Sequence, residues 1–127
     1  MPFPIVFGIP EGTSKETLSE LRKGIVSSIV TTMEVPTNWV HPLFVSDLLG
    51  EEPKEETEGS NTIYVRLDTA MLHGKTDADD LAVLITSDLA HVVQQTFGGK
   101  YEVEVFIGDL NIKWRTLLKP NMKSTET

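Results

Sequence analysis

The sequence predicts an α+β fold in which a strand-helix-strand unit occurs twice, forming a four-stranded mixed sheet with two helices on one face. The first observation is an internal repeat, because LFVSDL at 43–48 returns as VFIGDL at 105–110, 62 residues later. The second is that Gly12 and Gly74 stand at matching places before a helical pattern. A unit too short to bury its own apolar face is stabilised by a neighbouring copy, so we interpret the chain as one fused pair.

The first unit begins with a strand followed by a helix. Apolar residues alternate with smaller ones through 3–9 and predict a strand with one strongly apolar face: Phe3, Ile5, Phe7 and Ile9. Thr13 and Glu16 then have the spacing of a capping box, which marks a helix start. Apolar residues at helical spacing continue this helix to about residue 33: Leu18, Leu21, Ile25, Ile29 and Met33.

The breaker cluster VPTN at 35–38 ends this helix, and 39–48 reads as the second strand. Pro42 cannot donate a hydrogen bond within a sheet, so it marks an edge or a bulge. Residues 49–61 are acidic and almost free of apolar side chains, and we interpret them as a connector exposed to solvent.

The second unit repeats this order. Residues 62–72 alternate as a third strand, and Thr76 with Asp79 repeats the cap spacing. The second helix has a helical apolar stripe: Leu81, Leu84, Ile85, Leu89, Val92 and Val93. Gly98 and Gly99 end it, and the fourth strand has its own apolar face: Tyr101, Val103, Val105 and Ile107. We therefore predict a single domain, 1–127, with units at 2–48 and 62–110, the connector between them and a tail at 111–127.

Two helices cannot cover both faces of such a sheet. We expect the uncovered face to carry Phe44, Tyr64 and Phe106, and an exposed apolar face of that size suggests association between subunits.

Composition excludes several function classes. The sequence has no cysteine, so a thiol nucleophile and thiolate metal sites are excluded. His41, His73 and His91 lack metal-ligand spacing, so we expect no metal and no cofactor. The net charge is −8 and the basic residues are scattered, which argues against nucleic acid as a partner. We find neither a signal peptide nor a membrane span and expect a cytoplasmic protein.

A duplicated strand-helix-strand unit, a proline directly after Met1 and an apolar first strand leading to EGTS at 11–14 together resemble the tautomerase superfamily. The similarity covers nearly the whole chain. The helix exit MEVP at 33–36 and the late Trp114 look most like malonate semialdehyde decarboxylase. The resemblance implies a homotrimer with the sheets facing inward and a small anionic oxo acid as substrate.

The superfamily's catalyst is an N-terminal proline freed by removal of methionine, which corresponds here to Pro2. A free α-amino group has an ordinary pKa of ~7.7–8, so a modest shift fits it for proton transfer at neutral pH. Proline also fixes the direction of its nitrogen, and apolar surroundings disfavour the charged form. The alternative is that Pro2 only begins a strand. If Met1 is retained, the Pro2 nitrogen is an amide and cannot transfer a proton.

The resemblance also implies residues that hold the substrate. Lys75 stands where the fused families carry an arginine, and His73 stands where the decarboxylase carries a second one. The alternative is that Lys75 is an ordinary solvated residue at a helix start. Arg66 or Arg115 could assist, although Arg66 is better explained by a pairing with Asp68. Trp114 matches the decarboxylase tryptophan that lines the pocket.

Departures from the family limit the function. The stretch TNW at 37–39 lacks the decarboxylase aspartate, and the first unit's motif GTS at 12–14 lacks the family's cation. Simple proton transfer between carbon and oxygen, a keto-enol tautomerase or isomerase activity, needs the fewest residues. A decarboxylase-like lyase and a non-catalytic binding or assembly protein remain the alternatives.

Overall fold

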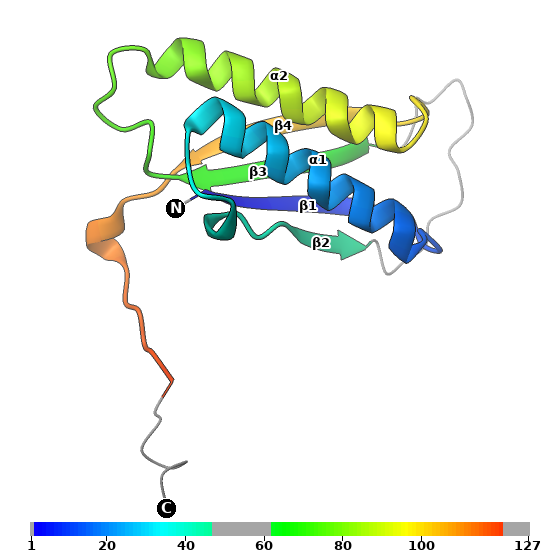
Figure 1. Ribbon diagram of the computed structural model, residues 1–127, viewed down its shortest axis with the longest axis horizontal. Helices are drawn as coiled ribbons and strands as arrows, with labels where there is room; N and C mark the ends of the chain where they lie inside the picture. The colour runs from blue at the N-terminus through cyan, green and yellow to red at the C-terminus, as the bar shows by residue number, and fades with distance from the viewer. Residues whose placement is uncertain (1, 47–61, 121–127) are drawn as a thin grey trace, which may run out of the picture.

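The two helices lie side by side on one face of a four-stranded sheet, as predicted (Figure 1). The computed structural model describes residues 2–46 and 62–120. The strands are β1 (Phe3–Ile9), β2 (Leu43–Ser46), β3 (Thr62–Thr69) and β4 (Glu102–Asp109), in the order β2-β1-β3-β4. Helix α1 (Lys15–Met33) follows β1, and helix α2 (Ala78–Thr96) follows β3.

The strand directions follow from the duplicated unit. Within each unit the two strands are parallel and a helix connects them, whereas β1 and β3 pair antiparallel at the centre of the sheet. The starts of β1 and β2 and the ends of β3 and β4 therefore meet at one end of the sheet. We call this the Pro2 end, because β1 begins there.

The core fills the space between the helices and the sheet. Its fully buried side chains come from both units: Val6, Leu21, Ile25, Ile29, Ile63, Val65, Leu67, Ile85, Leu89 and Val93. The helices approach closely at Gly24, where an added Cβ would lie 2.7 Å from Cγ1 of Val92. Farther along, the Thr32 hydroxyl donates to Asp88 over 3.4 Å. Leu84, which the sequence placed in the core stripe, is half exposed.

The first strand differs from the prediction at one residue, because Ile9 does not share the face of Phe3, Ile5 and Phe7. Val6 is the core residue of β1, whereas Phe3, Ile5 and Phe7 lie on the uncovered face. Gly8 adopts a φ of 87° within an irregularity between Phe7 and Ile9, and this bulge turns Ile9 into the core. The alternation of apolar residues along a sequence does not reveal where a bulge moves the following side chain to the other face of the sheet.

The assignment of Phe44 to the uncovered face is wrong. Phe44 pairs with the buried Val6 in the parallel β1–β2 ladder, so both side chains lie on the helix side. Consistent with this, the Arg22 guanidinium carbon of α1 lies 5.8 Å from the centroid of the Phe44 ring. The exposed apolar residues of the uncovered face are Phe3, Leu43, Val45, Tyr64 and Phe106.

The helix boundaries follow local chemistry that differs from the predicted caps. Ser14, not Thr13, caps α1, because its hydroxyl accepts from the Thr17 N–H over 3.1 Å. The predicted cap of α2 at Thr76 is absent, since Asp77 precedes the helix and makes no side-chain capping bond. Glu34 ends α1 in the left-handed region with a φ of 55°.

The second strand is shorter than predicted at its start. Thr37–Trp39 form a short 3-10 helix, η1, and β2 begins only at Leu43. The rest of the predicted strand, 47–48, and the connector, 49–61, lie outside the described residues. Among the helices that the structure does describe, none is long and apolar enough to cross a membrane.

Candidate active site

Pro2 lies at the end of the sheet where the loop after β3 begins. In the antiparallel ladder Phe3 pairs with Asp68, so Pro2 lies one residue beyond that pair, beside Thr69. Pro2 alternates with Phe3 and shares the helix side with Pro4 and Val6, and all three are buried. The Pro2 ring is therefore withdrawn from solvent.

The loop from β3 to α2 is built from successive turns that fix Lys75. The buried Thr69 hydroxyl accepts from the Met71 N–H over 3.0 Å and shapes the start of the loop. The His73 N–H then donates to the Ala70 carbonyl, and the Lys75 N–H donates to the Leu72 carbonyl, each over 3.2 Å. Gly74 supplies the φ of 77° that this path needs.

An open cavity of about 330 Å³ lies between this loop, the start of α2 and the end of β4. Its lining includes Thr69, His73, Lys75 and two carboxylates, those of Asp79 and Asp109. Among the described residues, Lys75 is the only lysine or arginine in the lining. The structure thus brings Lys75 and His73 to the strand end beside Pro2, but it surrounds them with two acidic groups.

His73 has one of these acidic groups as a neighbour. Its Nδ1 lies 3.4 Å from Oδ2 of Asp109, and both side chains are mostly exposed. Exposed pairs of this kind contribute little to stability. Asp109 and Asp79 are cavity residues that the sequence analysis did not propose. Asp109 lies at the end of β4 and Asp79 in the first turn of α2. These positions indicate a shared cavity only once it is known that the ends of β3 and β4 meet.

Arg66 lies on the uncovered face and does not line the cavity. Its Nε donates to Oδ1 of Asp68 over 2.7 Å, which is the pairing that the sequence favoured. Asp68 fits over Gly108 of the neighbouring strand, where a Cβ would collide with the carboxylate. A glycine at this position is therefore part of how the ion pair is held.

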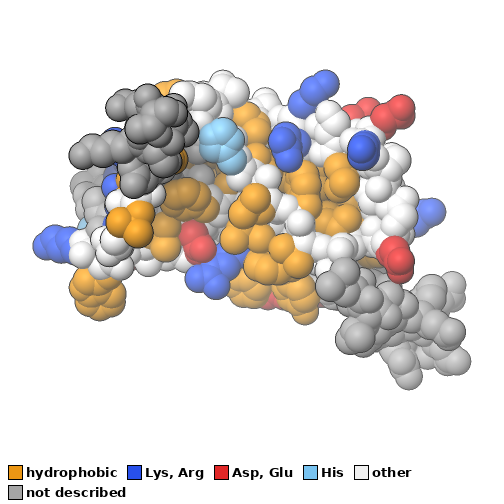
Figure 2. Space-filling model, turned by 90° about the horizontal axis from the view of Figure 1, so that it is seen from below, with side chains coloured by type: hydrophobic (Ala, Val, Ile, Leu, Met, Phe, Trp, Pro, Cys, Tyr) orange, Lys and Arg blue, Asp and Glu red, His pale blue; other side chains and the backbone are white. Residues whose placement is uncertain are grey.

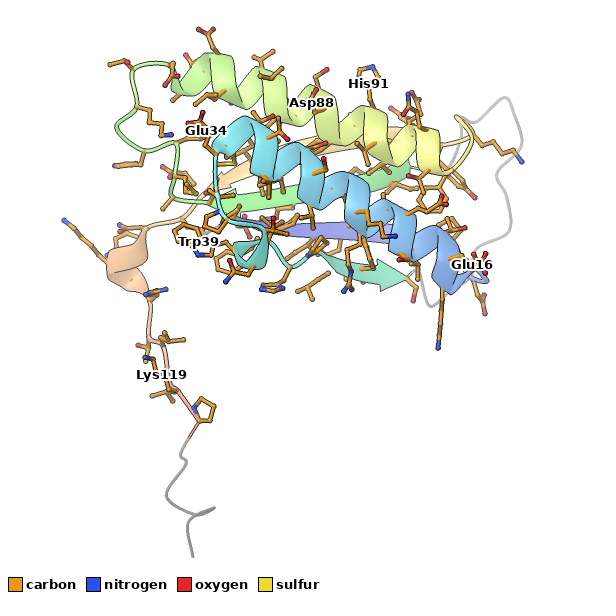
Figure 3. All side chains as sticks on the ribbon, viewed as in Figure 1. Glu16, Glu34, Trp39, Asp88, His91 and Lys119 are labelled. Carbon is orange, nitrogen blue, oxygen red and sulfur yellow. The ribbon has the colours of Figure 1, made fainter. Side chains whose placement is uncertain are left out.

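Trp114 and Arg115 lie outside the compact part of the structure. They follow the end of β4 in and after the short 3-10 helix η3 (Ile112–Trp114), on a segment that extends away from the sheet (Figure 1). Trp114 is 87% exposed, so it does not line the cavity of its own chain. The structure does bring a different tryptophan to the Pro2 end: Trp39, the last residue of η1, which lies before β2 in the chain (Figure 3).

Comparison with solved structures identifies the fold. A fused 4-OT described as a wild-type symmetric trimer matches with a TM-score of 0.65 and 20% identity over 85% of each chain. Macrophage migration inhibitory factor from Toxoplasma gondii matches with a TM-score of 0.68 and 13% identity, over 90% of this chain and 95% of that one. A third match, described as inactivated by 2-oxo-3-pentynoate, has a TM-score of 0.61 and 18% identity over 83% of each chain.

No protein-family model and no curated protein matches the sequence. The chain therefore has the fold of the tautomerase superfamily, and the resemblance drawn from the sequence is confirmed at the level of the fold.

Proposed function

We propose that this chain is a tautomerase-type enzyme that moves a proton between carbon and oxygen of a small oxo acid, with Pro2 as the catalytic base and acid. The observation that carries the proposal is the position of Pro2: buried, at the start of β1, one step from the Phe3–Asp68 pair and beside the loop that holds Lys75. Its nitrogen takes the proton from the enol hydroxyl. It then returns this proton to the neighbouring carbon, so a C–H bond replaces the O–H bond while a carbonyl replaces the carbon–carbon double bond.

Substrate capture is assigned to Lys75, aided by His73. A lysine carries the charge but lacks the bidentate fork of arginine, so it orients a carboxylate less firmly. The two carboxylates in the lining also weaken anion binding within one chain. We therefore assign the second cation, Arg115, and the apolar wall, Trp114, to a neighbouring chain, since both are exposed on a segment that leaves the body.

The proposed assembly is a homotrimer with the uncovered sheet faces inside. Phe3, Leu43 and Phe106 are each at least 45% exposed on that face, and burying them contributes roughly 25 cal/mol per Å². A trimer is how the fused 4-OT fold neighbours are described. Arg66 lies on this face, so its part in substrate binding depends on the assembly.

The test compares the processed protein, which starts at Pro2, with a variant that keeps Met1. Intact mass first establishes which form each sample contains. Ketonisation of phenylenolpyruvate, followed by absorbance, is expected only in the processed form. Its rate should depend on a group titrating between about pH 6 and 9, around the ordinary α-amino pKa. Equal rates in both forms would exclude Pro2.

Two other functions make different predictions. The decarboxylase-like alternative releases carbon dioxide from an aldehyde acid, with protonated Pro2 polarising the carbonyl. A non-catalytic binding or assembly role is favoured by one observation, the presence of two carboxylates in the same cavity lining as Lys75. Inertness of the processed protein on every oxo acid tried would support that role.

A further inference from the structure

The structure has a groove on the outer flank of α1 that shares no lining residue with the cavity of Lys75. Two open hollows, of about 250 and 450 Å³, share Arg22 as a common lining residue. We call them together the α1 groove. The smaller is lined by Lys15, Leu18, Ser19, Arg22 and Phe44, and the larger by Arg22, Lys23, Val26, Ser27, Val30, Thr31 and Thr37. The larger has the size of a small-molecule site, roughly 300–1,000 Å³.

The charge of the α1 groove is opposite to that of the chain. The whole sequence carries a net charge of −8, yet among the residues that the structure describes the lining has three cations, Lys15, Arg22 and Lys23, and no carboxylate. The Lys75 cavity, by contrast, combines one lysine with two carboxylates. An anion is therefore attracted to the α1 groove more strongly than to the Lys75 cavity of a single chain.

The groove also has apolar side chains where a solvent-facing helix flank usually carries polar ones. Val26 and Val30 are half-buried, one and two turns beyond Arg22 on the same stripe. Leu18 and Phe44 play the same part in the smaller hollow. Figure 2 views the molecule from below Figure 1, from the side of the sheet edge formed by β2, and it shows Lys and Arg side chains beside hydrophobic ones.

Arg22 contributes positive charge to the α1 groove and also contacts one of its apolar side chains. Its guanidinium carbon lies 5.8 Å from the centroid of the Phe44 ring, a cation–π arrangement that holds the side chain against the groove. No intramolecular ion pair involves Arg22 or Lys23 among the described residues. A guanidinium already held in place loses less rotamer freedom when it binds a carboxylate.

We propose that the α1 groove binds an unbranched aliphatic carboxylate of medium chain length, with the carboxylate at Arg22 and Lys23 and the chain along Val26 and Val30. The exposed apolar tail of a second copy is a poorer occupant. That tail offers Leu117 and Leu118, but it also carries Arg115 and Lys119, which the groove cations repel.

The test is calorimetric titration of the full-length protein with butyrate, hexanoate, octanoate and decanoate, with 1-decanol as the uncharged control. Affinity should rise about two- to fourfold per added methylene until the groove is filled, since a buried methylene contributes about 0.8 kcal/mol. The double variant Arg22→Ala, Lys23→Ala should bind decanoate at least about tenfold more weakly. The matched variant Lys100→Ala, Lys113→Ala removes the same charge elsewhere and should bind normally.

Three results would overturn the proposal. Equal affinities for butyrate and decanoate would mean that no site for the aliphatic chain exists, and equal affinities for decanol and decanoate would leave the cations without a role. Equal losses in the two double variants would indicate a general charge effect. The variant that keeps Met1 should bind decanoate unchanged, so failure of the catalytic proposal and failure of this one are distinguishable.

Discussion

The two helices approach closely at Gly24. Because of this contact, Gly24→Ala should destabilise the wild-type protein but stabilise the Val92→Ala variant. Replacing glycine by alanine inside a helix favours folding by about 1 kcal/mol. Here, however, the new Cβ would lie 2.7 Å from Cγ1 of Val92, and valine has few alternative rotamers in a helix. Overpacking of this kind costs about 1–3 kcal/mol. Gly24→Ala alone should therefore lower the free energy of unfolding by up to about 2 kcal/mol.

In the Val92→Ala background both γ-carbons are gone, and the same substitution should raise the free energy of unfolding by up to about 1 kcal/mol. The coupling in the double-mutant cycle is then about 1–3 kcal/mol. Urea unfolding followed by circular dichroism measures it, with all four proteins at one protomer concentration because association affects apparent stability. If Gly24→Ala changes the free energy of unfolding by the same amount, within about 0.5 kcal/mol, in both backgrounds, the contact between Gly24 and Val92 is refuted.

Three further predictions follow from other parts of the chain. Glu34→Gly should raise the free energy of unfolding by about 0.5–1 kcal/mol, because a residue with a Cβ is strained at the left-handed φ of 55° and glycine is not. A lower free energy of unfolding would contradict this conformation at the end of α1. Phe106→Asp should shift the assembly to monomers in light scattering, whereas Val83→Asp, on the helix surface, should not; a trimer in both would place the interface elsewhere. Lys75→Ala should raise the KM for an anionic oxo acid about tenfold or more and Lys100→Ala should not; equal effects would mean that Lys75 does not hold the carboxylate.

Much of the fold was predictable because periodicity and repetition report on it directly. The buried stripe of α1, with Leu21, Ile25 and Ile29, follows from helical spacing, and the four-stranded mixed sheet with two helices was expected from one unit used twice. The division into units at 2–48 and 62–110 stays a prediction, since their boundaries fall partly outside the described residues.

The errors have physical causes that alternation does not reveal. The bulge at Gly8 reverses the faces of β1, so Ile9 is buried while Phe3 is exposed. The short helix η1 delays β2, and the face of Phe44 is set by its pairing with Val6. These are properties of backbone conformation and strand register, which hydrophobicity alone does not encode.

The candidate site was predictable in part. The position of Pro2 beside the Lys75 loop follows once β1 and β3 pair antiparallel, and the sequence alone pointed to both residues. The two carboxylates of the cavity were missed because they come from separate segments that meet only in three dimensions. Trp114 was expected in the pocket, yet it is exposed on a tail, so any catalytic part for it requires a neighbouring chain.

The most direct test of the catalytic proline is covalent labelling with 2-oxo-3-pentynoate, the compound described as inactivating one of the fold neighbours. Its alkyne is conjugated to a ketone, so a free amine can add to it, and a proton moves to the adjacent carbon with no leaving group. Intact and peptide mass spectra of the processed protein should show one added reagent, located on Pro2, and none on the variant that keeps Met1. A label on Lys75 instead, equal labelling of both forms, or no label at all would contradict the account.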